Sequence, residues 1–142
     1  LEAVSRGVRV RLLLQGKVEY RLQHYGSQAL YDELLRGGVE IVEYRRSFLH
    51  AKVAVVDDWA TVGSSNIDPF SLLLAREANV GIYDAAFARR LRDLLNVAIE
   101  TGGVPIALHG HEQRPWHTRL MNAIAFLVLR IGVALSGVAG RY

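Results

Sequence analysis

Short apolar runs separated by polar connections divide the chain into strands and helices. Val8, Val10, Leu12 and Leu14 alternate at first with Arg9 and Arg11, and this period of two predicts a half-buried strand over 8–14. The same reasoning predicts further strands over residues 39–44, 52–56, 59–62 and 78–83.

Two helices are predicted between these strands. The segment 27–38 has apolar residues at helical spacing and closes with a pair of glycines, which is typical of a helix end. A longer helix is predicted over 84–100, where Asp84 can cap the first turn and a second glycine pair follows the last. Because strands and helices alternate, the sequence predicts an α/β sandwich with a mixed sheet flanked by helices.

The final segment has a different character. From Ala123 to Gly140 the only charged residue is Arg130, and this length only just reaches the roughly 20 residues that span a bilayer. Arg119, Asn122 and Arg130 lie at helical spacings on one side, and Trp116 precedes them. We therefore expect an apolar, amphipathic helix that lies in the plane of a membrane surface. The alternative is a helix that packs on the domain or on a missing neighbour.

Composition limits the class of protein. With 142 residues, of which 51% are hydrophobic, the chain is long enough to bury the core of one domain. The net charge is only +3, but arginine greatly outnumbers lysine, so a phosphate-bearing partner is permitted. The absence of cysteine excludes disulfides and thiolate-bound metals. No secretory signal pattern opens the chain, and its first residues look like the end of a helix, so we expect it to begin inside a larger protein.

One stretch, "FLHAKVAVVDDWATVGSSN", carries polar residues on predicted strands. Alternate side chains of a strand share a face, so His50 and Lys52 point the same way, as do Ser64 and Asn66 if the chain stays extended. Two adjacent strands would gather an imidazole, an ammonium, a hydroxyl and a carboxamide, a set well suited to a phosphate. Asp57 has the opposite parity from Lys52, so a structural or orienting role fits it better.

These residues also match a known signature. His50-x-Lys52-x4-Asp57, followed by Gly63-Ser64-Ser65-Asn66, resembles the phospholipase D superfamily motif H-x-K-x4-D-x6-G-S-x-N, called HKD. Beyond the motif, nearly the whole chain resembles the second half of a bacterial cardiolipin synthase.

The chain departs from that family in two respects. Five residues separate the aspartate from the glycine where the family has six, and the missing residue has to be absorbed in the turn to keep the strand register. Family members also carry two HKD motifs, whereas this chain has one.

The resemblance implies a role for each motif residue. His50 would attack phosphorus to give a phosphohistidine, or would protonate the leaving alcohol, and one motif leaves both roles open. Lys52 and Asn66 would bind the non-bridging oxygens, Ser64 would assist, and Asp57 would be the motif aspartate and one of the catalytic residues.

Glu77 matches a family acid that orients the histidine. Neither a metal nor a cofactor is implied by the resemblance. His109, His111, Glu112 and His117 offer metal-ligand types, but they lie in an interrupted connection without defined spacing, so we do not expect a metal site there.

The resemblance further implies an α/β phospholipase D-like sandwich that is incomplete at its N-terminus. Residues 1–109 would form the catalytic half-domain, and residues 110–142 would form a linker and the membrane-associating helix. The expected reaction is phosphatidyl transfer between phospholipids, with phosphatidylglycerol as the expected lipid, at the cytoplasmic face of a bacterial membrane. The expected protein partner is an N-terminal HKD half or a second copy.

Two alternatives remain at this point. The first is a phospholipase D-type phosphodiesterase or nuclease that completes its site as a homodimer and binds nucleic acid. An apolar tail has little use in a nuclease, which needs a basic groove instead. The second alternative is a lipid-binding half without catalytic activity of its own.

Overall fold

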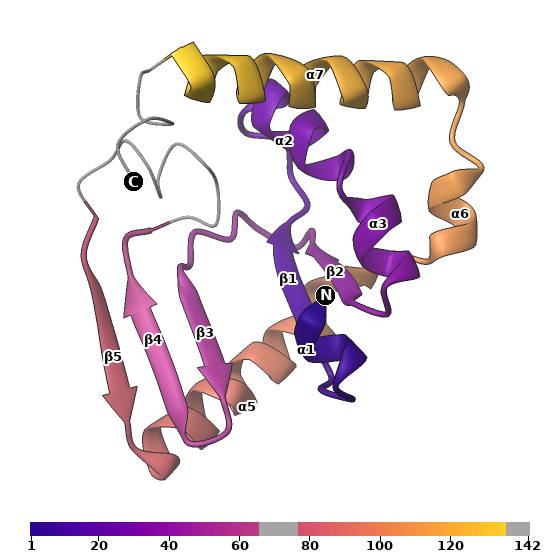
Figure 1. Cartoon of the computed structure of the whole chain (residues 1–142). Coiled ribbons are helices and arrows are strands. Elements are labelled where there is room, and N and C mark those ends of the chain that lie inside the picture. The colour runs from indigo at the N-terminus through magenta and orange to yellow at the C-terminus, as the bar shows by residue number, and fades with distance from the viewer. Residues whose placement is uncertain (66–76, 136–142) are drawn as a thin grey trace.

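Two three-stranded sheets, with helices around them, form the architecture (Figure 1). The structure is a computed structural model and describes residues 1–65 and 77–135. The strands are β1 Arg11–Gln15, β2 Glu40–Tyr44, β3 Val53–Val56, β4 Trp59–Gly63, β5 Asn79–Tyr83 and β6 Gly103–Pro105. The helices are α1 Glu2–Ser5, α2 Arg21–Gln28, α3 Tyr31–Arg36, α5 Ala85–Gly102, α6 Leu108–Glu112 and α7 Trp116–Leu135.

The first sheet has the order β1-β2-β6 and contains the core. β1 runs parallel to β2, and β6 pairs with β2 in the antiparallel direction, so the predicted mixed sheet is confirmed. Tyr31 of α3 packs with Val39 and Ile41, and all three are buried. Ile41 is only 2% exposed because helix α3 covers this face of β2. The first predicted strand, over 8–14, corresponds to β1, which pairs directly with β2.

The second sheet is antiparallel, with the order β3-β4-β5. Its three strands were all predicted, and α5 packs against them, as Figure 1 shows. The cap of α5 is confirmed as well, because the Phe87 backbone N–H donates to the Asp84 side chain at 2.8 Å. The α/β class predicted from the alternation is therefore confirmed, with the strands divided between two sheets.

Helix α2 and strand β6 were not predicted. The sequence of α2 is largely polar, and its one buried residue is Gly26. A Cβ added at Gly26 would lie 2.5 Å from the Leu129 Cδ1 atom of α7, so glycine permits the two helices to approach closely. The position of α2 is therefore set by its packing against α7, which lies about a hundred residues further along the chain.

The apolar tail forms the helix α7, which lies along α2 (Figure 1). Asn122 and Ala125 are buried on the inner side of α7, whereas Arg119 and Arg130 are exposed. Asn122, which the sequence placed at helical spacings with these arginines, therefore faces the domain, whereas the two arginines remain exposed. Packing on the domain accounts for one side of α7 only.

The opposite side of α7 is apolar and exposed. We call it the outer α7 face; its members are Trp116, Leu120, Met121, Ile124, Leu127, Val128, Ile131 and Leu135. By length and composition α7 could cross a membrane, and 11% of it is buried within the structure. Residues 136–140 of the expected apolar segment lie outside the described residues.

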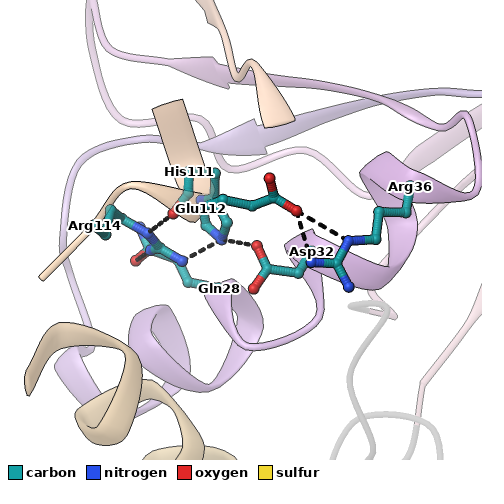
Figure 2. A network of polar contacts seen from close by, with 6 residues as sticks. All are labelled: Gln28, Asp32, Arg36, His111, Glu112 and Arg114. Carbon is teal, nitrogen blue, oxygen red and sulfur yellow. Dashed lines mark hydrogen bonds and ion pairs between the residues drawn. The ribbon is translucent and has the colours of Figure 1, made fainter. Parts of the chain in front are cut away.

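A polar network connects α6 to α2 and α3 (Figure 2). Arg36 of α3 pairs with Glu112 at 2.6 Å, and Arg114, which follows α6, donates to the Gln28 Oε1 atom of α2 at 2.8 Å. His111 is 6% exposed and stacks on Tyr31. Within residues 1–65 and 77–135, no cluster of three or more potential metal ligands occurs. The network thus fixes the position of the connection that leads into α7.

The buried His111 predicts a pH-dependent stability. Burial, followed by the nearby Arg114 guanidinium, lowers the pKa of His111, whereas Asp32 and Glu43 act in the opposite direction. Arg114 donates to the His111 Nε2 atom, and the Asp32 Oδ1 atom, 3.3 Å from the same nitrogen, has no hydrogen-bond donor. The Arg114 donor favours the neutral imidazole and the Asp32 oxygen favours the protonated one, but burial together with Arg114 outweighs Asp32. Since the folded pKa lies below the unfolded value of about 6.5, unfolded chains bind the proton more readily.

We therefore expect the melting temperature to fall as the pH is lowered from about 7 through 6.5 and below. The dependence should be smaller in His111→Gln. It should not vanish there, because burial also lowers the pKa of His24. Thermal unfolding, followed by circular dichroism over this pH range, gives the melting temperatures of the wild type and of His111→Gln. Identical pH profiles for the two proteins would contradict the assignment to His111.

Candidate active site

His50 and Lys52 lie directly in front of β3 and contact each other. The Lys52 Nζ atom is 2.6 Å from the His50 Nε2 atom. An ammonium group has no acceptor, so the imidazole Nε2 accepts this hydrogen bond and carries no proton in this arrangement. That is the form of a histidine that can attack phosphorus. His50 is exposed and Lys52 is half-buried, so both groups can be reached from solvent.

Ser64 and Glu77 form a second pair, where β4 ends and β5 is about to begin. The Ser64 hydroxyl donates to the Glu77 Oε2 atom and accepts from the Ala78 backbone N–H at 3.0 Å. The Ser64 N–H donates to the Ala78 carbonyl at 3.0 Å. Glu77 therefore orients Ser64, and within the described part of the chain it makes no hydrogen bond to His50.

The strand register shows how the two pairs are related. The Gly63 N–H donates to the Lys52 carbonyl at 3.0 Å, so the antiparallel β3–β4 pairing continues to these two residues. Directly opposed residues share a face, which would place Ser64 on the opposite face from Lys52 if the strand continued. The chain instead bends at Ser64. No hydrogen bond joins the two pairs within the described ranges.

Asp57 lies at the far end of the same hairpin. It is the first of two turn residues, with a φ of +49° that aspartate tolerates better than most residues. Five residues of extended chain place it about 16 Å from Lys52. Its backbone carbonyl accepts a hydrogen bond from Arg92 of α5, which ties the turn to that helix. The structure thus does not bring Asp57 to the other motif residues.

The hairpin between the motif residues turns within two residues. Val53 pairs with Val62 and Val56 pairs with Trp59, without an interruption between them. Between these pairs, Asp57 and Asp58 lie outside the ladder. With the motif spacing one residue short, this uninterrupted register places Ser64 out of phase with Lys52. Asn66, the remaining motif residue, lies outside the described residues.

Gly63 lets β4 and β5 come together at the site. A Cβ added at Gly63 would lie 2.5 Å from the Ala78 carbonyl oxygen and would overlap the Asn79 side chain. We expect Gly63→Ala to lower the free energy of unfolding by about 1–3 kcal/mol, because the backbone at Ala78 and the start of β5 have to move. Gly110→Ala is the matched control, since a Cβ at this α6 position meets nothing within 4 Å. Denaturant unfolding that ranks both variants alike would contradict the crowding at Gly63.

Sequence reasoning missed the residues that hold the connection between β2 and His50. The Leu49 N–H donates to the Gln15 Oε1 atom at 2.9 Å, and the Lys17 Nζ atom donates to the Arg46 carbonyl at 3.2 Å. Their position at the carboxyl end of β1 could have identified them from the sequence. Ligand sites of α/β proteins gather at the carboxyl ends of parallel strands.

Known proteins resemble this chain over most of its length. A family model described as "Cardiolipin synthase, PLD-like domain" matches residues 1–98. Cardiolipin synthase B of Escherichia coli K12 is 44% identical over 96% of the chain, and that of Salmonella typhi is 43% identical over 96%; the match covers 33% of each relative. Cardiolipin synthase 2 of Bacillus cereus is 35% identical over 85% of the chain and 24% of the relative.

The chain thus spans about a third of the length of the first two relatives. No solved structure matches it. The family match covers more than half of the chain, and it includes both polar pairs and the hairpin between them. The resemblance seen in the motif and the geometry of the hairpin therefore lead to one conclusion, which is that the chain belongs to the cardiolipin synthase family of PLD-like domains.

Proposed function

We propose that this chain supplies one catalytic half of a cardiolipin synthase-type phosphatidyltransferase. The observation that carries the proposal is the contact between the His50 Nε2 atom and the Lys52 ammonium at the exposed end of the hairpin. It joins an unprotonated imidazole nitrogen to a cation that can hold a phosphate oxygen, and Lys52 has to turn from Nε2 to that oxygen before the nitrogen attacks. The similarity to cardiolipin synthases supports the choice of substrate class.

In the first proposed step, the His50 Nε2 atom attacks the phosphorus of phosphatidylglycerol. A bond from nitrogen to phosphorus forms, and the bond from phosphorus to the glycerol oxygen breaks. A second histidine, from the partner half, gives its proton to the departing glycerol. Lys52 and Asn66 hold the non-bridging oxygens, whose negative charge has to be stabilised as the geometry at phosphorus changes.

In the second proposed step, a hydroxyl of another phosphatidylglycerol attacks the phosphohistidine. The partner histidine takes the proton of that hydroxyl, the bond from phosphorus to nitrogen breaks, and cardiolipin leaves. Dividing the exchange into two displacements allows a second alcohol, instead of water, to accept the phosphatidyl group.

The remaining site residues have supporting roles in this proposal. Ser64 assists with phosphate oxygens, and Glu77 holds the Ser64 hydroxyl. Because Glu77 makes no described contact with His50, the histidine that it would orient is the one from the partner half. Asp57 fixes the turn of the hairpin against α5 and takes no direct part in the chemistry.

The outer α7 face supports a membrane surface as a further partner. Within the described residues of α7 no side chain is acidic, and Arg119 and Arg130 are exposed. Trp116 is 75% exposed, and its ring is suited to the boundary between headgroups and acyl chains. Such a helix would lie in the cytoplasmic surface of a bacterial membrane, where arginines attract anionic lipids.

The proposal is tested with the complete protein that carries this chain and labelled phosphatidylglycerol in vesicles. We expect labelled cardiolipin and free glycerol, and an acid-labile phosphoprotein after rapid quenching. Peptide mapping should place the label on His50. Label on the partner histidine alone would reverse the two histidine roles, and release of phosphatidic acid without cardiolipin would make water the acceptor.

The nuclease alternative makes a different prediction in the same preparation. Nicking of plasmid DNA without lipid transfer would favour a homodimeric phosphodiesterase. The outer α7 face favours a lipid partner over nucleic acid, because binding to a nucleic-acid backbone depends on a cluster of cations.

A further inference from the structure

A short connection leads from β2 to the motif histidine, and we call residues 45–49 the lead-in segment. Its conformation decides where His50 lies, because His50 follows it directly. β1 and β2 are parallel, so their carboxyl ends lie at the same edge of the first sheet, beside the start of the lead-in segment (Figure 1). The residues at the end of β1 are therefore well placed to hold it.

Three consecutive residues at the end of β1 make these contacts. The Gly16 N–H donates to the Tyr44 carbonyl at 2.9 Å, at the point where β2 ends. Lys17 donates to the Arg46 carbonyl at 3.2 Å and lies 5.7 Å from the centre of the Phe48 ring. Gly16, between Gln15 and Lys17, has to be glycine, because a Cβ there would lie 2.8 Å from the Tyr44 carbonyl oxygen.

Gln15 makes the contact closest to the motif. Its Oε1 atom accepts the Leu49 N–H at 2.9 Å, one residue before His50. The other end of the same carboxamide is not satisfied, because Gln15 Nε2 is buried and has no hydrogen-bond partner within the described ranges. An apolar side chain of similar length would avoid this unpaired donor but would leave the Leu49 N–H without its acceptor, and each such loss costs about 1–3 kcal/mol. What glutamine supplies here, and an apolar side chain does not, is the contact to the Leu49 backbone.

We propose that Gln15 is a positioning residue for His50, which it holds through the Leu49 backbone. The inference rests on the function proposed above, because it assigns to Gln15 a part in the transfer step. In-line attack on phosphorus requires the attacking nitrogen in a narrow range of positions, and a displacement of about 1 Å can cost a hundredfold in rate. The exposed side chain of His50 has few contacts of its own, so its backbone has to be fixed from Gln15 and Lys17.

The test compares Gln15→Met with Gln15→Glu in the complete protein. Methionine has a similar length but removes the acceptor oxygen, and we expect kcat to fall about 10–100-fold with KM within about twofold. Glutamate keeps an acceptor for the Leu49 N–H, and we expect its kcat to stay within about threefold of the wild type. Gln113→Met is the control, because Gln113 is exposed and, among the residues that the structure describes, its side chain bonds to His109 alone.

Melting temperatures separate positioning from stability. A purely structural role predicts that both Gln15 variants melt early while the folded enzyme keeps its kcat, and this outcome would overturn the inference. If Gln15→Met fails to fold, Lys17→Met replaces it, since it removes the contact to Arg46 from an exposed side chain. A Lys17→Met enzyme with wild-type kcat would then refute positioning by the end of β1.

His50→Ala, assayed in parallel, keeps this inference apart from the proposed function. An active His50→Ala enzyme would refute the proposed function itself. An inactive His50→Ala enzyme together with a fully active Gln15→Met enzyme would refute the positioning role alone.

Discussion

Replacing His50 with alanine should lower the rate of phosphatidyl transfer at least about a thousandfold, because the proposed covalent intermediate forms on this residue. The large effect follows from the proposed two-step exchange, in which every transferred group passes through the histidine nitrogen. Transfer is measured with labelled phosphatidylglycerol and the complete protein. Lys52→Met should also reduce kcat, since it removes the cation beside the reacting nitrogen.

Because His50 is exposed, its replacement tests activity without a large change in stability. Because the side chain is exposed and its one hydrogen bond within residues 1–65 and 77–135 is to Lys52, its removal should change the free energy of unfolding by less than about 0.5 kcal/mol. His109→Ala is the matched control, since His109 is also exposed and its side chain is hydrogen-bonded to Gln113. A His50→Ala protein that still makes cardiolipin at the wild-type rate would exclude a catalytic role for the motif histidine.

The elements that sequence analysis predicted well are those with local signals. β3, β4 and β5 are short apolar runs bounded by turn residues, and α5 has an Asp84 cap whose hydrogen bond the structure contains. Helix α2 lacked such a signal, because its partner is α7 and its closest approach is a glycine. The division into two sheets depends on long-range pairing, which no local pattern contains.

Sequence analysis named candidate site residues but did not predict how they are arranged. The motif placed His50 and Lys52 side by side at a strand end, and they are in contact. The convergence of Ser64 with them was inferred from parity within each strand. The faces of two paired strands depend on their register, which places Gly63 opposite Lys52 and leaves Ser64 with Glu77. Asp57 was included by its place in the motif, although its parity already pointed to a structural role.

A charge on the outer α7 face should have the second large effect, in this case on membrane binding. Leu127 and Ile131 are 56% and 47% exposed and lie one turn apart. Burial of each side chain in a lipid surface contributes about 1.5–3 kcal/mol, and a carboxylate there is also repelled by anionic headgroups. The double variant Leu127→Glu/Ile131→Glu should therefore bind vesicles at least about a hundredfold more weakly. Sedimentation of the complete protein with phosphatidylglycerol-containing vesicles measures this.

A second pair of exposed apolar residues shows whether this loss is specific to α7. Leu94 and Val97 of α5 are 62% and 54% exposed, so Leu94→Glu/Val97→Glu adds the same charge at sites of similar exposure. We expect that control to bind vesicles like the wild type. If both double variants bind normally and remain folded, another part of the complete protein covers the outer α7 face. If both lose binding equally, charge itself weakens adsorption and α7 has no special role. Loss in the α7 variant alone would mean that the same helix that packs on α2 through Ala125 presents its other side to lipid.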